Sequence, residues 1–174
     1  DRVTVWDTAT ARKTHEFTAY WVAPNSLSMS RDGSVLAAKT SRLGVTVWDL
    51  TTGDVIRMIS TAETDARSVS LDADGTRLAI GWANGTAEVH DVRTGEKLLE
   101  AMGHTKPVGS VHLTPDGSRL ATGSADFRAK VWDVATGECE LSLEWDGVGG
   151  GILEHLVFHR VCVFGTLEGW AGHF

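Results

Sequence analysis

The chain has little cysteine, little positive charge and no long apolar run. Two cysteines in 174 residues, Cys139 and Cys162, are too few for a disulfide framework, which predicts a reducing, intracellular and cytoplasmic setting. Lys and Arg number 16 against 23 Asp and Glu, a net charge of −7 without a basic run. This balance argues against nucleic-acid or anionic-membrane surfaces. No apolar stretch approaches the roughly 20 residues that span a bilayer.

Other expected signals are also missing. No segment of the best-formed part of the chain has the pattern of a useful helix, and no signal peptide is visible. The chain opens on Asp1 without an initiator Met. We therefore expect a piece of a longer protein or a processed product.

Three sequence markers return with one period. Asp7, Asp49, Asp91 and Asp133 are each 42 residues apart and end short β-rich runs such as VTVWD. The same step separates Asp32-Gly33, Asp74-Gly75 and Asp116-Gly117, and also Thr52-Gly53, Thr94-Gly95 and Thr136-Gly137. A fixed period of this length indicates one supersecondary unit used repeatedly, each burying its apolar face against the next.

The clearest unit runs from Gly103 to Trp145. Alternating apolar residues predict four strands, around 108–113, 120–124, 129–132 and 141–143, separated by turns that contain Gly or Asp. Asp-Gly supplies the positive φ of a tight turn. Four antiparallel strands in about 42 residues are one propeller blade.

The motifs Gly103-His104, SVHLTPDGSRLATGSAD and AKVWD together resemble the WD-repeat β-propeller family over nearly the whole chain. This resemblance implies an all-β fold and a hydrogen-bonded structural tetrad formed by His104, Ser124, Asp126 and Trp132. The other repeats depart from it. The equivalent positions hold Ala62, Trp82, Asn84 and His90 in the middle repeat, and Tyr20, Thr40, Arg42 and Trp48 in the earlier one.

The register divides one propeller region into blades. We expect a partial blade at 1–18, whole blades at 19–60, 61–102 and 103–144, and a degenerate partial blade at 145–174, where the Asp-Gly turn is lost. About four blades' worth of strands favours an open arc or partial propeller. A four-bladed ring and a dimer of two arcs are the alternatives. Open blade edges would allow self-association.

Patterns that suggest chemistry are weak. A catalytic triad of His104, Ser124 and Asp126 would have its hydroxyl consumed inside a blade. Gly147–Gly151 lacks the Lys-Ser/Thr of a phosphate-binding loop. His155 and His159 do not form an HExxH zinc motif. The aligned inner-strand positions hold mainly serines, such as Ser68 and Ser70, without a recurring acid or His. We therefore expect no catalytic residue, metal or cofactor.

The resemblance implies a non-catalytic scaffold that binds partner proteins or peptides through its inter-blade loops, with no nucleic-acid or membrane partner. Trp21 and Trp82 are large aromatics outside the WD position, each more typical of a core than of a contact. The contact candidates are Trp21, Asn25, Ser41, Asp65, Arg67, Lys106 and Ala125. The alternative is the regulatory or sensor tail of a larger signalling protein, such as a kinase or an ATPase.

Overall fold

The computed structural model describes residues 2–18, 27–41, 44–60 and 64–144. Every regular element within these ranges is a β-strand, so the predicted all-β class is confirmed. The same ranges contain no helix long and apolar enough to cross a membrane. The expected partial blade at 145–174 lies outside the described residues.

The fourteen strands form one hairpin and three four-stranded antiparallel sheets. The hairpin pairs β1 (Arg2–Asp7) with β2 (Arg12–Thr18). The first full sheet contains β3 (Leu27–Met29), β4 (Val35–Ser41), β5 (Gly44–Asp49) and β6 (Val55–Ser60). The second contains β7 (Ala66–Leu71), β8 (Arg77–Trp82), β9 (Ala87–Asp91) and β10 (Lys97–Ala101). The third contains β11 (Val108–Leu113), β12 (Arg119–Ser124), β13 (Arg128–Asp133) and β14 (Cys139–Glu144).

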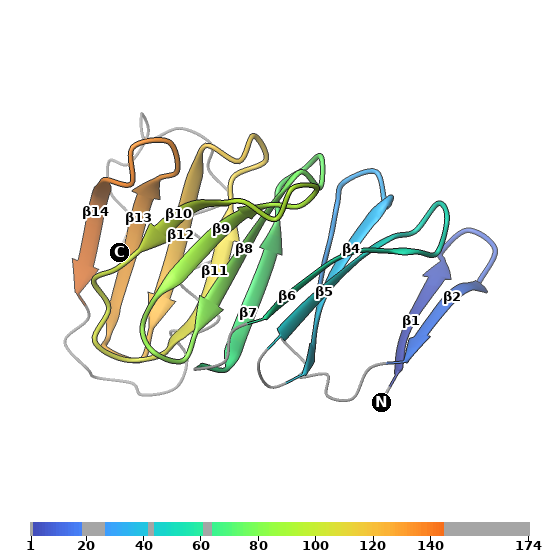
Figure 1. The fold of residues 1–174 in the computed structure, drawn as a ribbon, viewed down its shortest axis with the longest axis horizontal. Helices are drawn as coiled ribbons and strands as arrows, with labels where there is room; N and C mark the ends of the chain where they lie inside the picture. Colours follow the sequence, from blue (N-terminus) through green and yellow to red (C-terminus); the bar gives the residue numbers. More distant parts are fainter. Residues whose placement is uncertain (1, 19–26, 42–43, 61–63, 145–174) are drawn as a thin grey trace.

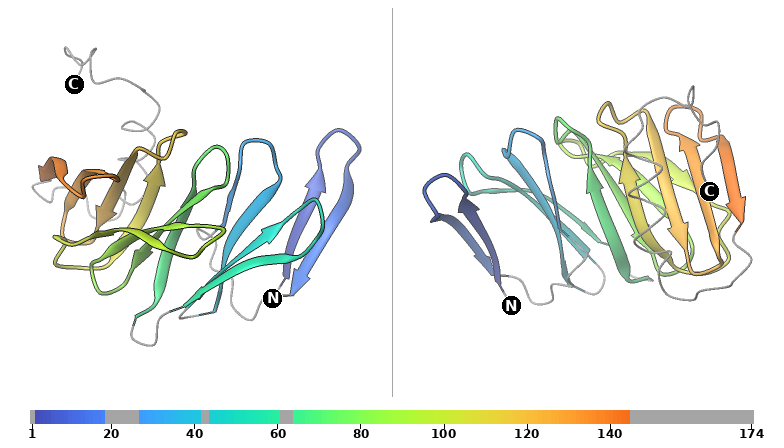
Figure 2. Two further views of the ribbon diagram at one scale, coloured as in Figure 1. Left: turned by 45° about the horizontal axis from the view of Figure 1, so that its top comes forward. Right: turned by 180° about the vertical axis from the view of Figure 1, so that it is seen from behind.

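The sheets stand in a row as blades. Figures 1 and 2 show the β1–β2 hairpin at one end and β13 and β14 at the other. The first strand of each later blade packs on its predecessor: β7 lies against β3 and β4, and β11 against β7 and β8. No sheet of the described chain joins the two ends, so the blades form an open, partial propeller.

The core lies between neighbouring blades. One cluster, which includes Val47, Val69 and Ile80, joins the first and second blades. Another, which includes Val89 and Val111, joins the second and third. The second blade thus has an apolar neighbour on both faces, which explains why β7 and β8 are buried almost throughout.

The hairpin is packed by aromatic rings. Phe17 of β2 stacks on Trp48 of β5 at 4.9 Å between ring centroids, and His15 stacks on Phe17 at 5.8 Å. Val3 and Leu36 are buried in the same cluster. The two strands at the front of the chain therefore hold the place of two outer strands against the first full blade.

The three Asp-Gly dipeptides all lie between the first and second strands of their blades, as predicted. Gly33, Gly75 and Gly117 have φ of 75°, 69° and 66°. Asp32 accepts hydrogen bonds from the backbone N–H and the hydroxyl of Ser34, and this pattern fixes the turn locally. The turn residues are therefore dictated by backbone conformation.

Gly75→Ala is expected to lower the free energy of unfolding more than Gly33→Ala. The two residues hold one turn position with nearly equal φ. A Cβ on Gly33 would lie 3.9 Å from Met29 Sδ, an ordinary contact, whereas one on Gly75 would meet the Val35 side chain of the preceding blade at 2.8 Å. We expect losses of about 1 and about 2–3 kcal/mol in urea unfolding. Equal losses would show that the blades do not approach this closely.

Candidate interaction surface

A chain of hydrogen bonds crosses the third blade. The Trp132 indole Nε1–H donates to Thr122 Oγ1 at 3.0 Å, and Thr122 Oγ1 lies 2.8 Å from His104 Nε2. His104 Nδ1 lies 2.9 Å from a carboxylate oxygen of Asp126. The bonds therefore run from the indole through the hydroxyl and the imidazole to the carboxylate.

The protons of this network have one consistent arrangement. Asp126 is ionised, so His104 carries its proton on Nδ1 and donates it to the carboxylate. The Thr122 hydroxyl then donates to His104 Nε2 while it accepts from Trp132. Burial lowers the pKa of His104 below its ordinary 6.5, although the hydrogen bond and charge of Asp126 oppose this shift. The His104 ring is thus neutral at physiological pH.

The hydroxyl of the network corrects the sequence prediction, which assigned it to Ser124. Ser124 Oγ instead donates to the Lys106 carbonyl at 2.9 Å. Thr122 is fully buried one pleat deeper in β12, whereas Ser124 lies at the strand end, opposite Val108. Residues two apart on a strand share a face, so alternation did not separate them. The position of the Trp132 indole in the folded blade brings it within hydrogen-bonding distance of Thr122.

The second blade replaces this tetrad with a network around Glu88. Glu88 Oε2 accepts from Trp82 Nε1–H at 2.9 Å and lies 3.0 Å from His90 Nε2, while Lys97 Nζ donates to Oε1 at 3.1 Å. Burial acts to raise the pKa of Glu88, but hydrogen bonds and charge from His90 and Lys97 outweigh it and lower the pKa to about 2. Trp82 is 1% exposed, so it belongs to the core.

Sequence comparison with the tetrad did not reveal this network. Position 88 is not one of the four tetrad positions, and its signal was only an acidic residue inside the β-rich run AEVHD. In the first blade the equivalent site holds a hydroxyl pair, Thr40 and Thr46, with 2.6 Å between their Oγ1 atoms. Each of the three blades thus buries a different set of hydrogen-bonded side chains at this site.

The stability of the fold is expected to fall as the pH drops below 6.5. The unfolded chain protonates His104 with its ordinary pKa of 6.5, whereas the folded blade resists protonation because the His104 pKa is lowered. The contribution is therefore complete above pH 6.5 and is lost progressively below it. Urea unfolding between pH 5 and pH 8 measures the slope. His104→Gln should flatten it; an unchanged slope in this variant would assign the effect to another group.

Three of the inner-strand serines link neighbouring blades. Ser28 Oγ accepts from the Leu71 backbone N–H at 2.9 Å across the first blade boundary. Across the next boundary, Ser68 accepts from Val111 at 3.2 Å and Ser70 from Leu113 at 3.1 Å. The recurrence of small hydroxyls in the sequence is therefore explained by inter-blade hydrogen bonds. No group of three His, Cys, Asp or Glu that could hold a metal occurs among the described residues.

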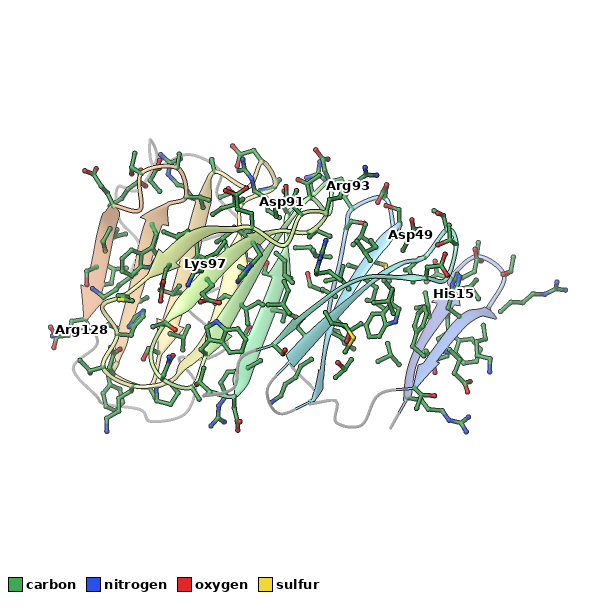
Figure 3. All side chains as sticks on the ribbon, viewed as in Figure 1. His15, Asp49, Asp91, Arg93, Lys97 and Arg128 are labelled. Atoms are coloured by element: carbon green, nitrogen blue, oxygen red, sulfur yellow. The ribbon has the colours of Figure 1, made fainter. Side chains whose placement is uncertain are left out.

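The blades have two chemically different edges. We call the edge with the first-to-second and third-to-fourth strand turns the turn edge. Figure 3 shows Asp49, Asp91 and Arg93 along it, with Arg128 placed away from it. Hydrogen bonds from Ser34 and Ser30 lower the pKa of Asp32 to about 2, and bonds from Thr114 and Ser118 do the same for Asp116. These carboxylates are ionised and engaged by their own turns.

The opposite edge, which we call the loop edge, carries the second-to-third turns 83–86 and 125–127 and the segments 64–65 and 102–107 before the first strands. The Ala83 N–H donates to the Asp65 carbonyl at 2.9 Å, and the Ala125 N–H donates to the Pro107 carbonyl at 3.1 Å. The structure thus brings Lys106 beside Ala125, and Asp65 beside the 83–86 turn.

The predicted contact residues divide accordingly. Arg67, Lys106 and Ala125 are exposed, and Asp65 is half-buried. Ser41 ends β4, where it pairs with Gly44. Trp21 and Asn25 lie outside the described residues. Sequence reasoning missed Phe127, which follows Ala125 and Asp126 in the same turn and is 50% exposed.

Comparison with known protein families agrees with this architecture. Residues 95–133 match the family model described as WD domain, G-beta repeat. These residues therefore contain a WD repeat, which supports the resemblance of the chain to the WD-repeat family. The match spans the end of the second blade and most of the third, where the tetrad lies. No curated protein matches the chain.

WD repeats in general mediate protein–protein interactions and are non-catalytic. The second blade is packed on both faces, which leaves its turns and loops as the parts open to a partner.

Proposed function

We propose that this chain is a non-catalytic scaffold that binds partner proteins or peptides through the loop edge of its WD blades. The observation that carries this proposal is the rigid pairing of two loop segments in the third blade, 102–107 and 124–128. The Thr105 N–H donates to Asp126 Oδ2 at 3.0 Å, and Ser124 Oγ donates to the Lys106 carbonyl. Lys106 and Ala125 are thus presented in a fixed geometry, which reduces the entropy lost on binding.

The groups that could support catalysis are already committed. His104 and Asp126 bond to each other inside the blade, with 1% and 5% of their side chains exposed. Ser68 and Ser70 are buried and bond to the backbone of the next blade. These groups have structural partners and little access to a substrate, which supports binding over reaction.

The test compares surfaces of one folded protein. Three proteins would be immobilised: the parent chain, a Lys106→Glu/Ala125→Arg variant and a Met58→Ala variant. Each would be incubated with cell extract and cross-linked, and the captured proteins would be identified by mass spectrometry. Met58 is 71% exposed on β6 and is the control, because it is an exposed side chain away from the loop edge. We expect one set of proteins to be lost only with the loop-edge variant. Equal recovery on all three would contradict the proposal.

Self-association is a further expected property. In the described chain β1 pairs only with β2, which leaves its other edge without a strand. Unpaired strand edges template pairing with another chain. Sedimentation of the purified protein should therefore show a mass that rises with concentration. A single monomeric species at all concentrations would show that this edge is covered.

Two proposals rest on composition. We propose an intracellular, cytoplasmic setting from the low cysteine content, and neither nucleic-acid nor membrane partners from the net charge of −7. A fluorescent fusion would test the location. A role as the regulatory or sensor part of a larger signalling protein would use the same loop edge and is the alternative to a free-standing scaffold.

A further inference from the structure

Phe127 combines exposure with an unfavourable backbone conformation. It follows Asp126 in the turn between β12 and β13, with φ of 64°, and half of its surface is exposed. A bulky residue in the left-handed region is a genuine outlier, and such strain gathers at binding sites. A ring that is half exposed gains only part of the burial energy that would offset this strain.

The turn holds Phe127 in this conformation. The Phe127 N–H donates to the Ser124 carbonyl at 3.2 Å, which closes the turn before it. The Arg128 N–H donates to Asp126 Oδ1 at 3.0 Å, which fixes the residue after it. Asp126 is itself held by His104. The ring is therefore mounted on a backbone that the buried tetrad keeps rigid.

The equivalent position of the second blade is held by a glycine, which adopts a positive φ without strain. Gly85, 42 residues earlier, has φ of 91° and closes the same kind of turn on Trp82. A Cβ on Gly85 would meet the His104 carbonyl at 2.7 Å and the Lys106 carbonyl at 3.1 Å. The second blade thus uses a glycine that the next loop covers, whereas the third blade presents an exposed aromatic ring.

The loop and the strand that flank the Phe127 turn carry three basic side chains. Lys106 is exposed, and Lys130 lies over the Trp132 ring at 5.7 Å. Arg128, whose side chain is 40% exposed, pairs with the exposed Glu144 at 3.2 Å, and such a surface pair offsets its charge only in part. The acid in this turn, Asp126, is buried against His104. This basic patch stands on a chain whose net charge is −7.

We propose that Phe127 is the hydrophobic anchor of a binding site for an acidic peptide segment that carries an apolar side chain. The ring supplies rigid apolar area of the kind that dominates protein interfaces. Lys106, Arg128 and Lys130 supply complementary charge, which accelerates and orients the encounter. This inference rests on the proposed scaffold function and names the chemistry of the partner.

The experiment selects a library of random dodecapeptides on the whole chain and measures the enriched peptides by fluorescence polarisation. We expect enrichment of peptides with Leu, Ile or an aromatic residue among Asp and Glu. Phe127→Gly should weaken their binding at least tenfold without lowering the urea midpoint of unfolding, because Gly accepts the positive φ. Met58→Ala is the matched control and should leave the affinity unchanged. Binding should weaken as salt is raised.

Three results would overturn the proposal. They are an unchanged affinity in Phe127→Gly, enrichment of basic peptides, or a urea midpoint that falls in Phe127→Gly as it does for a core substitution. The last would show that the ring packs within the chain. Partner proteins that are lost with the Lys106→Glu/Ala125→Arg variant but bind Phe127→Gly normally would contradict the role of Phe127. That result would leave the scaffold function supported.

Discussion

Thr122→Val is expected to lower the free energy of unfolding by about 3 kcal/mol. Valine keeps the shape of threonine but removes the hydroxyl that accepts from Trp132 Nε1 and bonds to His104 Nε2. Thr122 is fully buried, so no solvent can replace the lost partner. Each orphaned buried group costs about 1–3 kcal/mol. Urea unfolding followed by Trp fluorescence measures the loss.

Ser124→Ala is the matched control for this prediction. Its hydroxyl, two residues along the same strand face, bonds only to the Lys106 carbonyl and to the Asp126 N–H near the surface. We expect a loss of about 1 kcal/mol or less. If Ser124→Ala were the more damaging change, the hydroxyl of the network would be Ser124, as the sequence first predicted. Similar losses in both would mean that the network is not the main source of stability in this blade.

Glu88→Ala is expected to destabilise the second blade by about 3–5 kcal/mol, the cost of breaking a buried charge network. The substitution leaves the Trp82 indole N–H and His90 Nε2 without their acceptor inside the sheet. Glu100→Ala is the control, because Glu100 receives only Lys97 Nζ and is largely exposed. Its loss should be under about 0.5 kcal/mol. A comparably small loss for Glu88→Ala would show that solvent reaches the network.

The lowered pKa of Glu88 also predicts that the free energy of unfolding falls at acid pH. Its pKa is about 2 in the folded protein against an ordinary 4.5, so the unfolded chain binds a proton more readily in this window. The contribution is present above pH 4.5 and is lost as the pH falls toward 2. Glu88→Gln should reduce this loss of stability at acid pH. It should not affect the loss that comes from His104, which begins near pH 6.5.

The sequence alone determined the period, the strand composition of each blade and the place of the Asp-Gly turns. These features follow from local rules that repeat in register: alternation along a strand, and backbone φ at positions such as Gly33 and Gly75. A pattern that recurs every 42 residues is therefore sufficient to predict an all-β blade.

The tertiary structure alone decided which side chains meet. Thr122 and Ser124 share a strand face, and only the position of the Trp132 indole selects Thr122. Glu88 became the centre of a network because Trp82 of β8 and Lys97 of β10, the strands on either side of it, reach its carboxylate. Such contacts run diagonally between strands, so residue spacing along the chain does not encode them. The strained conformation of Phe127 has the same origin, because the surrounding tetrad and turn impose it.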